Sequence, residues 1–376
     1  MSLSGSGKDT QKAYTRAIVR RPGYTARSLV VPSNRLAKGE PMADSECSRR
    51  AFIKASAAGV VGMTVSPTML AAQSEKREKA NAPEKECAMK IGFHTDAFNS
   101  SYKSFEACLQ WAQKNGVHYI ECGLIDGVSW IHGLGYQPHV AMYEDPAILQ
   151  KKMAGYGVRF SQVDAAYPLS GKDGMMRGVP YVLNAIRWAK LAGCPCVATT
   201  DGLHKPEGLD DDEAMGLMKR CYEQIIEVAE AHEIIVNIEV HGYFTTNPDK
   251  LAKMFEFSKS PYFRLNLDTG NSFIAGQDPV AFCKRFLDRI THTHIKDVSE
   301  SLAAAVRGEQ TGIAVSQCAI GDGVNADNIR KVLAMLRDRG FDGVLSMECE
   351  GNGGPMIEKS LAWLRATLKE LRIKEG

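Results

Sequence analysis

From Lys90 onward, short runs rich in β-branched and aromatic residues alternate with helical stretches of about 10–20 residues. This alternation is typical of a parallel sheet with helical crossovers. Eight strand–helix units over about 290 residues predict an α/β fold, a closed (β/α)8 TIM barrel. The alternative is a doubly wound open sheet, which needs a topological switch point, and no Gly-rich phosphate loop marks one.

The units divide the barrel region as follows. The predicted strands are 90–93, 119–122, 159–163, 196–199, 234–239, 263–268, 290–295 and 344–348. The predicted helices are 104–114, 146–154, 181–191, 210–231, 248–257, 279–286, 326–339 and 357–371. The acidic run Asp210–Glu213 suits a helix start, because acidic side chains face the positive end of the helix dipole. A longer insertion follows the seventh strand.

The N-terminal region has a different character. Residues 1–41 are basic and aperiodic and are interpreted as a non-native or disordered leader, with translation starting at Met42. Residues 42–72 contain Arg49 and Arg50 followed by an apolar, small-residue stretch, which predicts a twin-arginine signal and a periplasmic or extracytoplasmic protein. A membrane anchor that stays uncleaved is the alternative. Residues 73–89 are expected to be a linker, and residues 90–376 the barrel.

Charge argues against one class of partner. Residues 1–72 hold 11 of the 46 basic and 4 of the 44 acidic residues, which leaves 35 and 40 in the remainder. A mildly acidic body argues against nucleic acid, because phosphate binding relies on clustered Lys and Arg. No stable membrane association is expected after signal cleavage, and a homo-oligomer is left open.

The ten cysteines are scattered along the chain, without a Cys-x-x-Cys pair. A zinc ribbon or a redox motif is therefore not indicated. Buried free thiols are the expected state.

Four consecutive predicted strands end in polar residues. Residues i and i+2 of a strand face the same side, and the intervening Ile238, Leu267 and Met347 are apolar. The polar sets are therefore expected to point into the barrel at the C-terminal rim, where such barrels carry their active sites. They are Asn237, Glu239 and His241; Asn266 and Asp268; His292 and His294; Glu348 and Glu350.

Carboxylates buried together are costly unless a positive charge compensates, and a divalent cation does so. We therefore assign Glu239, Asp268, His294 and Glu348 as ligands of one ion. Three carboxylates and one imidazole suit Mn²⁺, Mg²⁺ or Co²⁺ better than a sulfur-loving ion. Each residue alone would equally fit a solvated carboxylate or a hydrogen-bonded histidine, so the assignment depends on all four.

The motifs that carry these residues resemble a known family. They are Ile238–His241, Leu267–Asn271, His292–Asp297 and Ser346–Glu348. Together they look like the xylose-isomerase-like TIM-barrel family, also called sugar phosphate isomerases/epimerases or AP-endonuclease family 2, over residues 90–372.

The resemblance implies a metal-dependent sugar isomerase or epimerase. It implies that Glu239 and Glu348, besides holding the ion, move the proton on opposite faces of the substrate through an enediolate. Two positions depart from the ketose epimerases of the family: Asn271 stands where they have histidine, and Glu300 where they have arginine. Arg307 is a candidate substitute for that arginine.

Other residues at the predicted rim are candidates for contact with substrate. Trp130 and Tyr167 are candidates for stacking on a sugar ring. Lys296 is a candidate for contact with a substrate oxygen, with an ordinary salt bridge to Asp297 or another acid as the alternative. The remaining candidates are His94, Glu121, Asp164, Asp201, His204, His241 and Asn271.

Several functions remain open at this point. The stretch His294–Val298 looks like the inosose-dehydratase branch, so a lyase or dehydratase acting on a keto-sugar, keto-glycoside or keto-inositol is the main alternative. An abasic-site nuclease is disfavoured by the acidic body. A sugar-binding barrel without catalysis is the remote alternative.

Overall fold

A computed structural model describes residues 87–101, 104–126, 138–308, 314–351 and 353–376. The chain divides into two units, Met1–Arg77 and Glu78–Gly376, and the described residues all belong to the second. The predicted leader and export signal, and the linker up to residue 86, lie outside the described residues and stay predictions.

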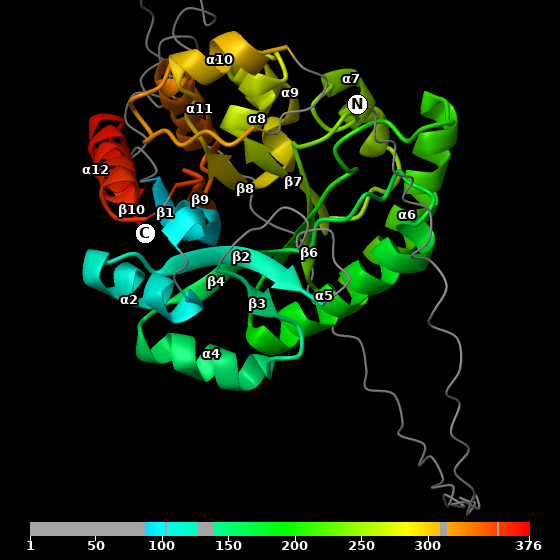
Figure 1. Cartoon of the computed structure of the whole chain (residues 1–376), viewed down its shortest axis with the longest axis horizontal. Coiled ribbons are helices and arrows are strands. Elements are labelled where there is room, and N and C mark those ends of the chain that lie inside the picture. Colours follow the sequence, from blue (N-terminus) through cyan, green and yellow to red (C-terminus); the bar gives the residue numbers. More distant parts are fainter. Residues whose placement is uncertain (1–86, 102–103, 127–137, 309–313, 352) are drawn as a thin grey trace, which may run out of the picture. The chain divides into compact units, whose positions relative to one another are not determined.

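Eight parallel strands close into a barrel (Figure 1), because β1 pairs with both β2 and β9. This closure confirms the (β/α)8 prediction and excludes the doubly wound sheet, which has free edges. The barrel strands are β1 Ala88–His94, β2 Tyr119–Ile125, β4 Arg159–Asp164, β5 Cys196–Thr199, β6 Ile235–Glu239, β7 Phe263–Asp268, β8 Ile290–Ile295 and β9 Val344–Met347.

Strand β1 begins two residues before its predicted start, inside the segment 73–89 interpreted as a linker. Two things hold these residues: Met89 is fully buried, and Ala88 and Met89 pair with a short C-terminal strand, β10 Lys374–Glu375. A second short strand, β3 Val140–Ala141, pairs in parallel with the last two residues of β2. Neither short strand was predicted, because two residues leave no periodicity to detect.

Helices alternate with the strands and cover the outside of the barrel (Figure 1). The acidic run does open a helix: Asp210 and Glu213 form a capping box at its start. The helices are α2 Phe105–Asn115, α4 Pro146–Gly155, α5 Val179–Ala192, α6 Asp211–His232, α7 Pro248–Met254, α8 Thr269–Ile274, α9 Pro279–Phe286, α10 Glu300–Val306, α11 Ala326–Arg339 and α12 Pro355–Glu370, with the 3-10 helices η1 Thr95–Ser101 and η3 Leu287–Arg289 and the π-helical turn η2 Gly174–Gly178.

The barrel interior is polar as well as buried. Glu121 on β2 contacts His294 on β8 at 2.9 Å, although these strands are not neighbours in the sheet, so the contact crosses the interior. The alternate residues Leu265 and Leu267 belong to the apolar core instead. The structure thus separates β7 into one apolar and one polar face, as the alternation predicts.

The nine cysteines in the described part of the chain are all buried and unpaired, which confirms the expected free thiols. In the same residues, no helix combines the length and the apolar character needed to cross a membrane.

Candidate metal centre

The four predicted ligands meet at the C-terminal ends of β6, β7, β8 and β9. One ligand atom from each of Glu239, Asp268, His294 and Glu348 lies within 4.8 Å of the others. All four side chains are buried. The convergence follows from the fold, because parallel strands in a barrel end at the same rim.

The imidazole of His294 stands at the middle of this cluster. Its Nδ1 lies 3.1 Å from Glu239 Oε1, 3.5 Å from Glu348 Oε2 and 3.9 Å from Asp268 Oδ2. Its Nε2 lies 2.9 Å from Glu121 Oε2. An ionised carboxylate only accepts hydrogen bonds, so with a proton on Nε2 for Glu121 the imidazole can offer Nδ1 as a ligand to an ion among the other three carboxylates.

Two buried carboxylate oxygens of the cluster accept no hydrogen bond among the described residues: Asp268 Oδ2 and Glu348 Oε2. The other oxygen of Asp268 is held by the backbone N–H groups of Gly270 and Asn271, at 2.7 and 2.8 Å, at the start of α8. Oxygens of this kind are costly to bury without a partner. They fit a divalent cation, with one imidazole and three carboxylates as donors.

The pKa values of the Asp268 and Glu348 carboxyl groups are shifted in opposite directions. Burial, together with the charge of Glu348, raises the pKa of Asp268 well above its usual range. Burial also opposes ionisation of Glu348, but the charges of Lys296 and His294 outweigh it and hold the pKa of that carboxyl at about 2. Negative charge therefore persists beside a carboxyl that resists it, and a cation would relieve the conflict.

Glu121 lies within β2, which runs on to Ile125, and not at the end of the strand as predicted. Its carboxylate also accepts hydrogen bonds from Gln162 Nε2 at 2.7 Å and Ser346 Oγ at 3.0 Å. Burial raises the pKa of this carboxyl, but the charges of His294 and His292 outweigh burial and hold it well below its usual range. Both oxygens of Glu121 are thus engaged by neighbouring side chains in this structure, and its contact with substrate stays a prediction.

We expect Glu121→Gln to weaken metal binding about 10–100-fold, because it removes the negative partner that orients a ligand histidine. Isothermal titration with Mn²⁺ measures this loss. Glu227→Gln, on the exposed face of α6, is the matched control and should bind as the parent does. Equal affinities in the two variants would contradict the positioning role of Glu121.

Several other predicted residues lie close to the cluster. His94 and Glu348 offer ligand atoms within 4.8 Å of each other. Lys296 is fully buried, with Nζ 2.9 Å from Glu350 Oε1 and 3.7 Å from Glu348 Oε2. The predicted salt bridge of Lys296 to another acid therefore exists, at Glu350, whereas Asp297 accepts from the backbone N–H groups of Gly321, Gly323 and Asn325.

Three further candidates border the same space. Burial and the charge of Glu239 raise the pKa of Asp164 to about 8. Burial lowers the pKa of His241, and the charges of Glu239 and Glu348 partly offset this lowering. Asn271 donates from Nδ2 to Val240 O at 3.1 Å, which ties the start of α8 to the residue after β6. Their contact with substrate stays a prediction.

Three predicted substrate residues are not brought to the cluster. Asp201 accepts hydrogen bonds from Phe244 N at 2.6 Å and Thr245 Oγ1 at 2.8 Å, so it braces the loop after β6. His204 is exposed. Arg307 is exposed, stacks on Phe273 at 3.8 Å and donates to backbone carbonyls at the end of α8. The Arg307 guanidinium is thus engaged near the end of α8, and its role as the substitute arginine stays a prediction.

Two further buried acids lie at the site: Asp96, which was not predicted, and Glu350, which was predicted only to face inward. Asp96 follows His94 by two residues, and that His-x-Asp spacing at a strand end was the available signal. Glu350 holds Lys296 and accepts from Ser316 N at 2.6 Å. Its φ of 45° is a conformation that non-glycine residues rarely adopt, so its contacts must hold it there.

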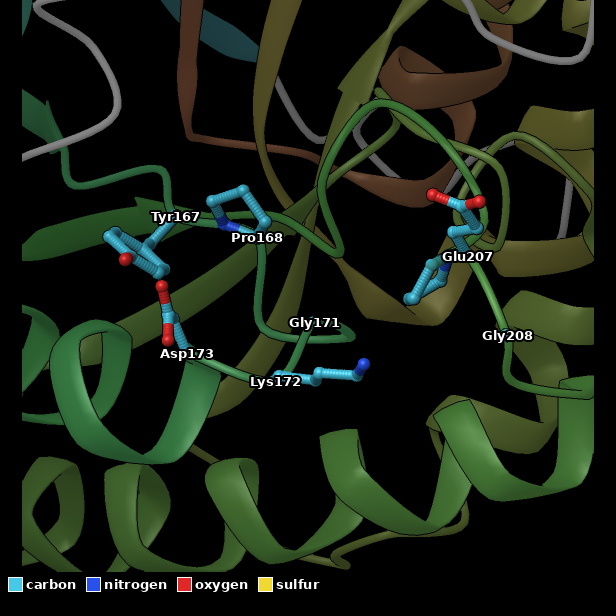
Figure 2. A pocket seen from close by; sticks show the side chains of 8 residues that line it. Tyr167, Pro168, Gly171, Lys172, Asp173, Glu207 and Gly208 are labelled. Carbon is cyan, nitrogen blue, oxygen red and sulfur yellow. The ribbon is translucent and has the colours of Figure 1, made fainter.

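The loops after β4 and β5 form an open cavity of about 710 Å³ on the same rim. Figure 2 shows Tyr167, Lys172 and Asp173 on one side of it and Glu207 on the other. None of the four clustered residues lines this cavity. Tyr167 also packs against Tyr181, with ring centroids 6.4 Å apart, while Trp130 lies outside the described residues.

Known proteins share this architecture. An inosose dehydratase of Clostridium botulinum (strain Eklund 17B / Type B) is 24% identical over 147 residues, 37% of this chain and 48% of the relative. The chain therefore spans about half the length of that relative.

Two solved structures match most of the chain. A D-tagatose 3-epimerase-like protein matches with a TM-score of 0.59 and 19% identity, over 75% of this chain and 98% of its own. The IOLI protein with a binding zinc atom matches with a TM-score of 0.57 and 14% identity, over 76% and 98%. At such identities these matches show the fold alone. The model of the xylose isomerase-like TIM barrel family matches residues 109–367, and the chain belongs to this family.

Proposed function

We propose that the barrel is a divalent-metal-dependent enzyme that removes a proton from the carbon next to a carbonyl group of a sugar, as an isomerase or epimerase. The observation that carries this proposal is the meeting of Glu239 and Glu348 beside one imidazole nitrogen, 3.1 and 3.5 Å from His294 Nδ1. The names of the epimerase-like structure and of the dehydratase relative support a sugar-like substrate.

The two glutamates approach from different strands. Glu239 ends β6 and Glu348 follows β9, with β7 and β8 between them in the sheet. A substrate carbon held between them would meet one carboxylate as proton acceptor and the other as proton donor. Both side chains are buried, which limits proton exchange with bulk water. Mn²⁺, Mg²⁺ or Co²⁺, when bound, would polarise the substrate oxygens.

A dehydratase is the second candidate, acting on a keto-sugar, keto-glycoside or keto-inositol. Two observations favour it: the inosose dehydratase relative, and Lys296 Nζ 3.7 Å from Glu348 Oε2. Glu239 would take the proton here as well, and the buried Lys296 ammonium near Glu348 would offer a hydrogen-bond donor to the hydroxyl group that leaves. Elimination then yields water and an unsaturated product.

Proton exchange in heavy water tests the proposal and separates the two candidates. The full chain is incubated with Mn²⁺ and a panel of keto-sugars and keto-inositols, and the products are followed by NMR. An epimerase introduces deuterium into an intact sugar, whereas a dehydratase forms an unsaturated product. Glu239→Gln is expected to lower either rate about 10²–10⁴-fold, the usual contribution of a general base.

Glu256→Gln, on the exposed surface after α7, is the matched control and should keep the parent rate. Binding of sugars without exchange or elimination, in the parent protein loaded with metal, would overturn the catalytic proposal and favour a sugar-binding barrel.

A further inference from the structure

A second group of donors lies beside the first, on its β1 side. His94 ends β1, Asp96 lies in η1, and Glu348 follows β9. One ligand atom from each lies within 4.8 Å of the other two. The group forms because β1 and β9 are paired, with Phe93 opposite Met347, so the residues that follow these positions emerge side by side.

Asp96 is the unusual member of this group. Its side chain is fully buried, and neither carboxylate oxygen accepts a hydrogen bond among the described residues. The nearest positive candidate is His94, whose Nδ1 lies 3.3 Å from Asp96 Oδ1. That nitrogen also accepts the backbone N–H of Asp96 at 3.2 Å. A carboxylate buried in this state costs several kcal/mol without a charged partner.

His94 faces Asp96 Oδ1, but Asp96 Oδ2 accepts no hydrogen bond among the described residues. Lys296 is the buried ammonium nearby, but its Nζ is 2.9 Å from Glu350 Oε1 and 3.7 Å from Glu348 Oε2. A cation placed between Asp96 and Glu348 would contact Asp96 Oδ2 and Glu348 Oε2, which accept no hydrogen bond among the described residues.

We propose that His94, Asp96 and Glu348 form a second divalent-cation site, which shares Glu348 with the cluster of Glu239, Asp268 and His294. A carboxylate has two oxygens and can serve two ions at once, as in two-metal sites. One imidazole and two carboxylates suit Mn²⁺, Co²⁺ or Zn²⁺. Three protein donors leave coordination positions open to water or to a substrate oxygen.

Metal counting on the full chain tests this site without any assay of activity. The protein is loaded with Mn²⁺, dialysed against metal-free buffer and analysed by mass spectrometry. The parent should hold two ions per barrel and Asp96→Asn one. Asp145→Asn, an exposed helix cap at the start of α4, is the matched control and should hold two.

If Asp96→Asn does not fold, as judged by circular dichroism, His94→Gln takes its place with the same expectation of one ion. One ion in the parent and one in Asp96→Asn would overturn the second site and leave the proposed function standing. Two ions in the parent and two in Asp96→Asn would mean that the second ion binds elsewhere, and this result would also overturn the second site. A parent protein without any bound ion would overturn the second site and the proposed function together.

Discussion

Asp268→Asn is expected to remove the ion held by Glu239, Asp268, His294 and Glu348 while leaving the fold intact. Asparagine keeps an oxygen for the N–H groups of Gly270 and Asn271, but it puts an NH₂ group where Oδ2 faces the cluster. Because a bound ion contributes several kcal/mol of charge stabilisation, proton exchange should fall by about 10³-fold or more. Metal content should fall by one ion per barrel.

Asp278→Asn provides the control for this substitution. Asp278 caps α9 by accepting from Val280 N at 2.9 Å, as Asp268 caps α8, but its side chain is exposed on the surface. This variant should keep both its metal and its rate. If Asp268→Asn kept the parent's metal content and exchange rate, the cluster would not be the catalytic metal centre.

Chelation of the metal is expected to lower the melting temperature by about 5–15 °C. An ion present at 100–1,000 times its dissociation constant stabilises the folded state by about 2.7–4.1 kcal/mol, and in domains of this size each kcal/mol shifts the midpoint by a few degrees. The structure offers a specific cause: without a cation, Asp268 Oδ2 and Glu348 Oε2 stay buried with no hydrogen-bond partner. Differential scanning calorimetry of metal-loaded and chelated protein measures the effect.

The gain from metal should depend on pH with a definite sign. Because burial and Glu348 raise the pKa of Asp268, its ionisation destabilises the metal-free fold as pH rises past the carboxyl's unfolded pKa of about 3.9. The cation offsets that cost, so the stabilisation should grow from acidic to neutral pH. Asp268→Asn should show a much smaller metal-dependent shift, and a parent protein with no shift at any pH would contradict the account.

The barrel could be read from the chain because each strand carries its own signal. Leu265 and Leu267 alternate with Asn266 and Asp268, and that alternation fixes both the strand and its inward face. Caps such as Asp210 with Glu213 mark helix starts in the same local way. The pairing of β10 with β1 left no such signal, since it depends on where the last helix returns the chain.

The site residues that lie at strand ends could be predicted, because alternation along a strand determines the side to which each side chain points. Glu239 and His294 belong to strands whose alternation directs them inward, and the structure brings them together. Asp201 and Arg307 follow elements, and a residue in a loop can turn toward the rim or toward a neighbouring backbone. Both turn to backbone groups. Glu121 was expected at the end of its strand, but β2 continues to Ile125, and the predicted strand stopped three residues short of that end.

Glu348 follows β9, and β9 is the strand that joins β8 to β1. The event that seals the circle therefore also delivers the last member of the cluster. Until β9 and Glu348 have been synthesised, the nascent chain carries only three of the four predicted metal ligands. Binding of the metal should therefore coincide with closure of the barrel. The time course of binding of a luminescent or paramagnetic ion would then report the rate of this last folding step.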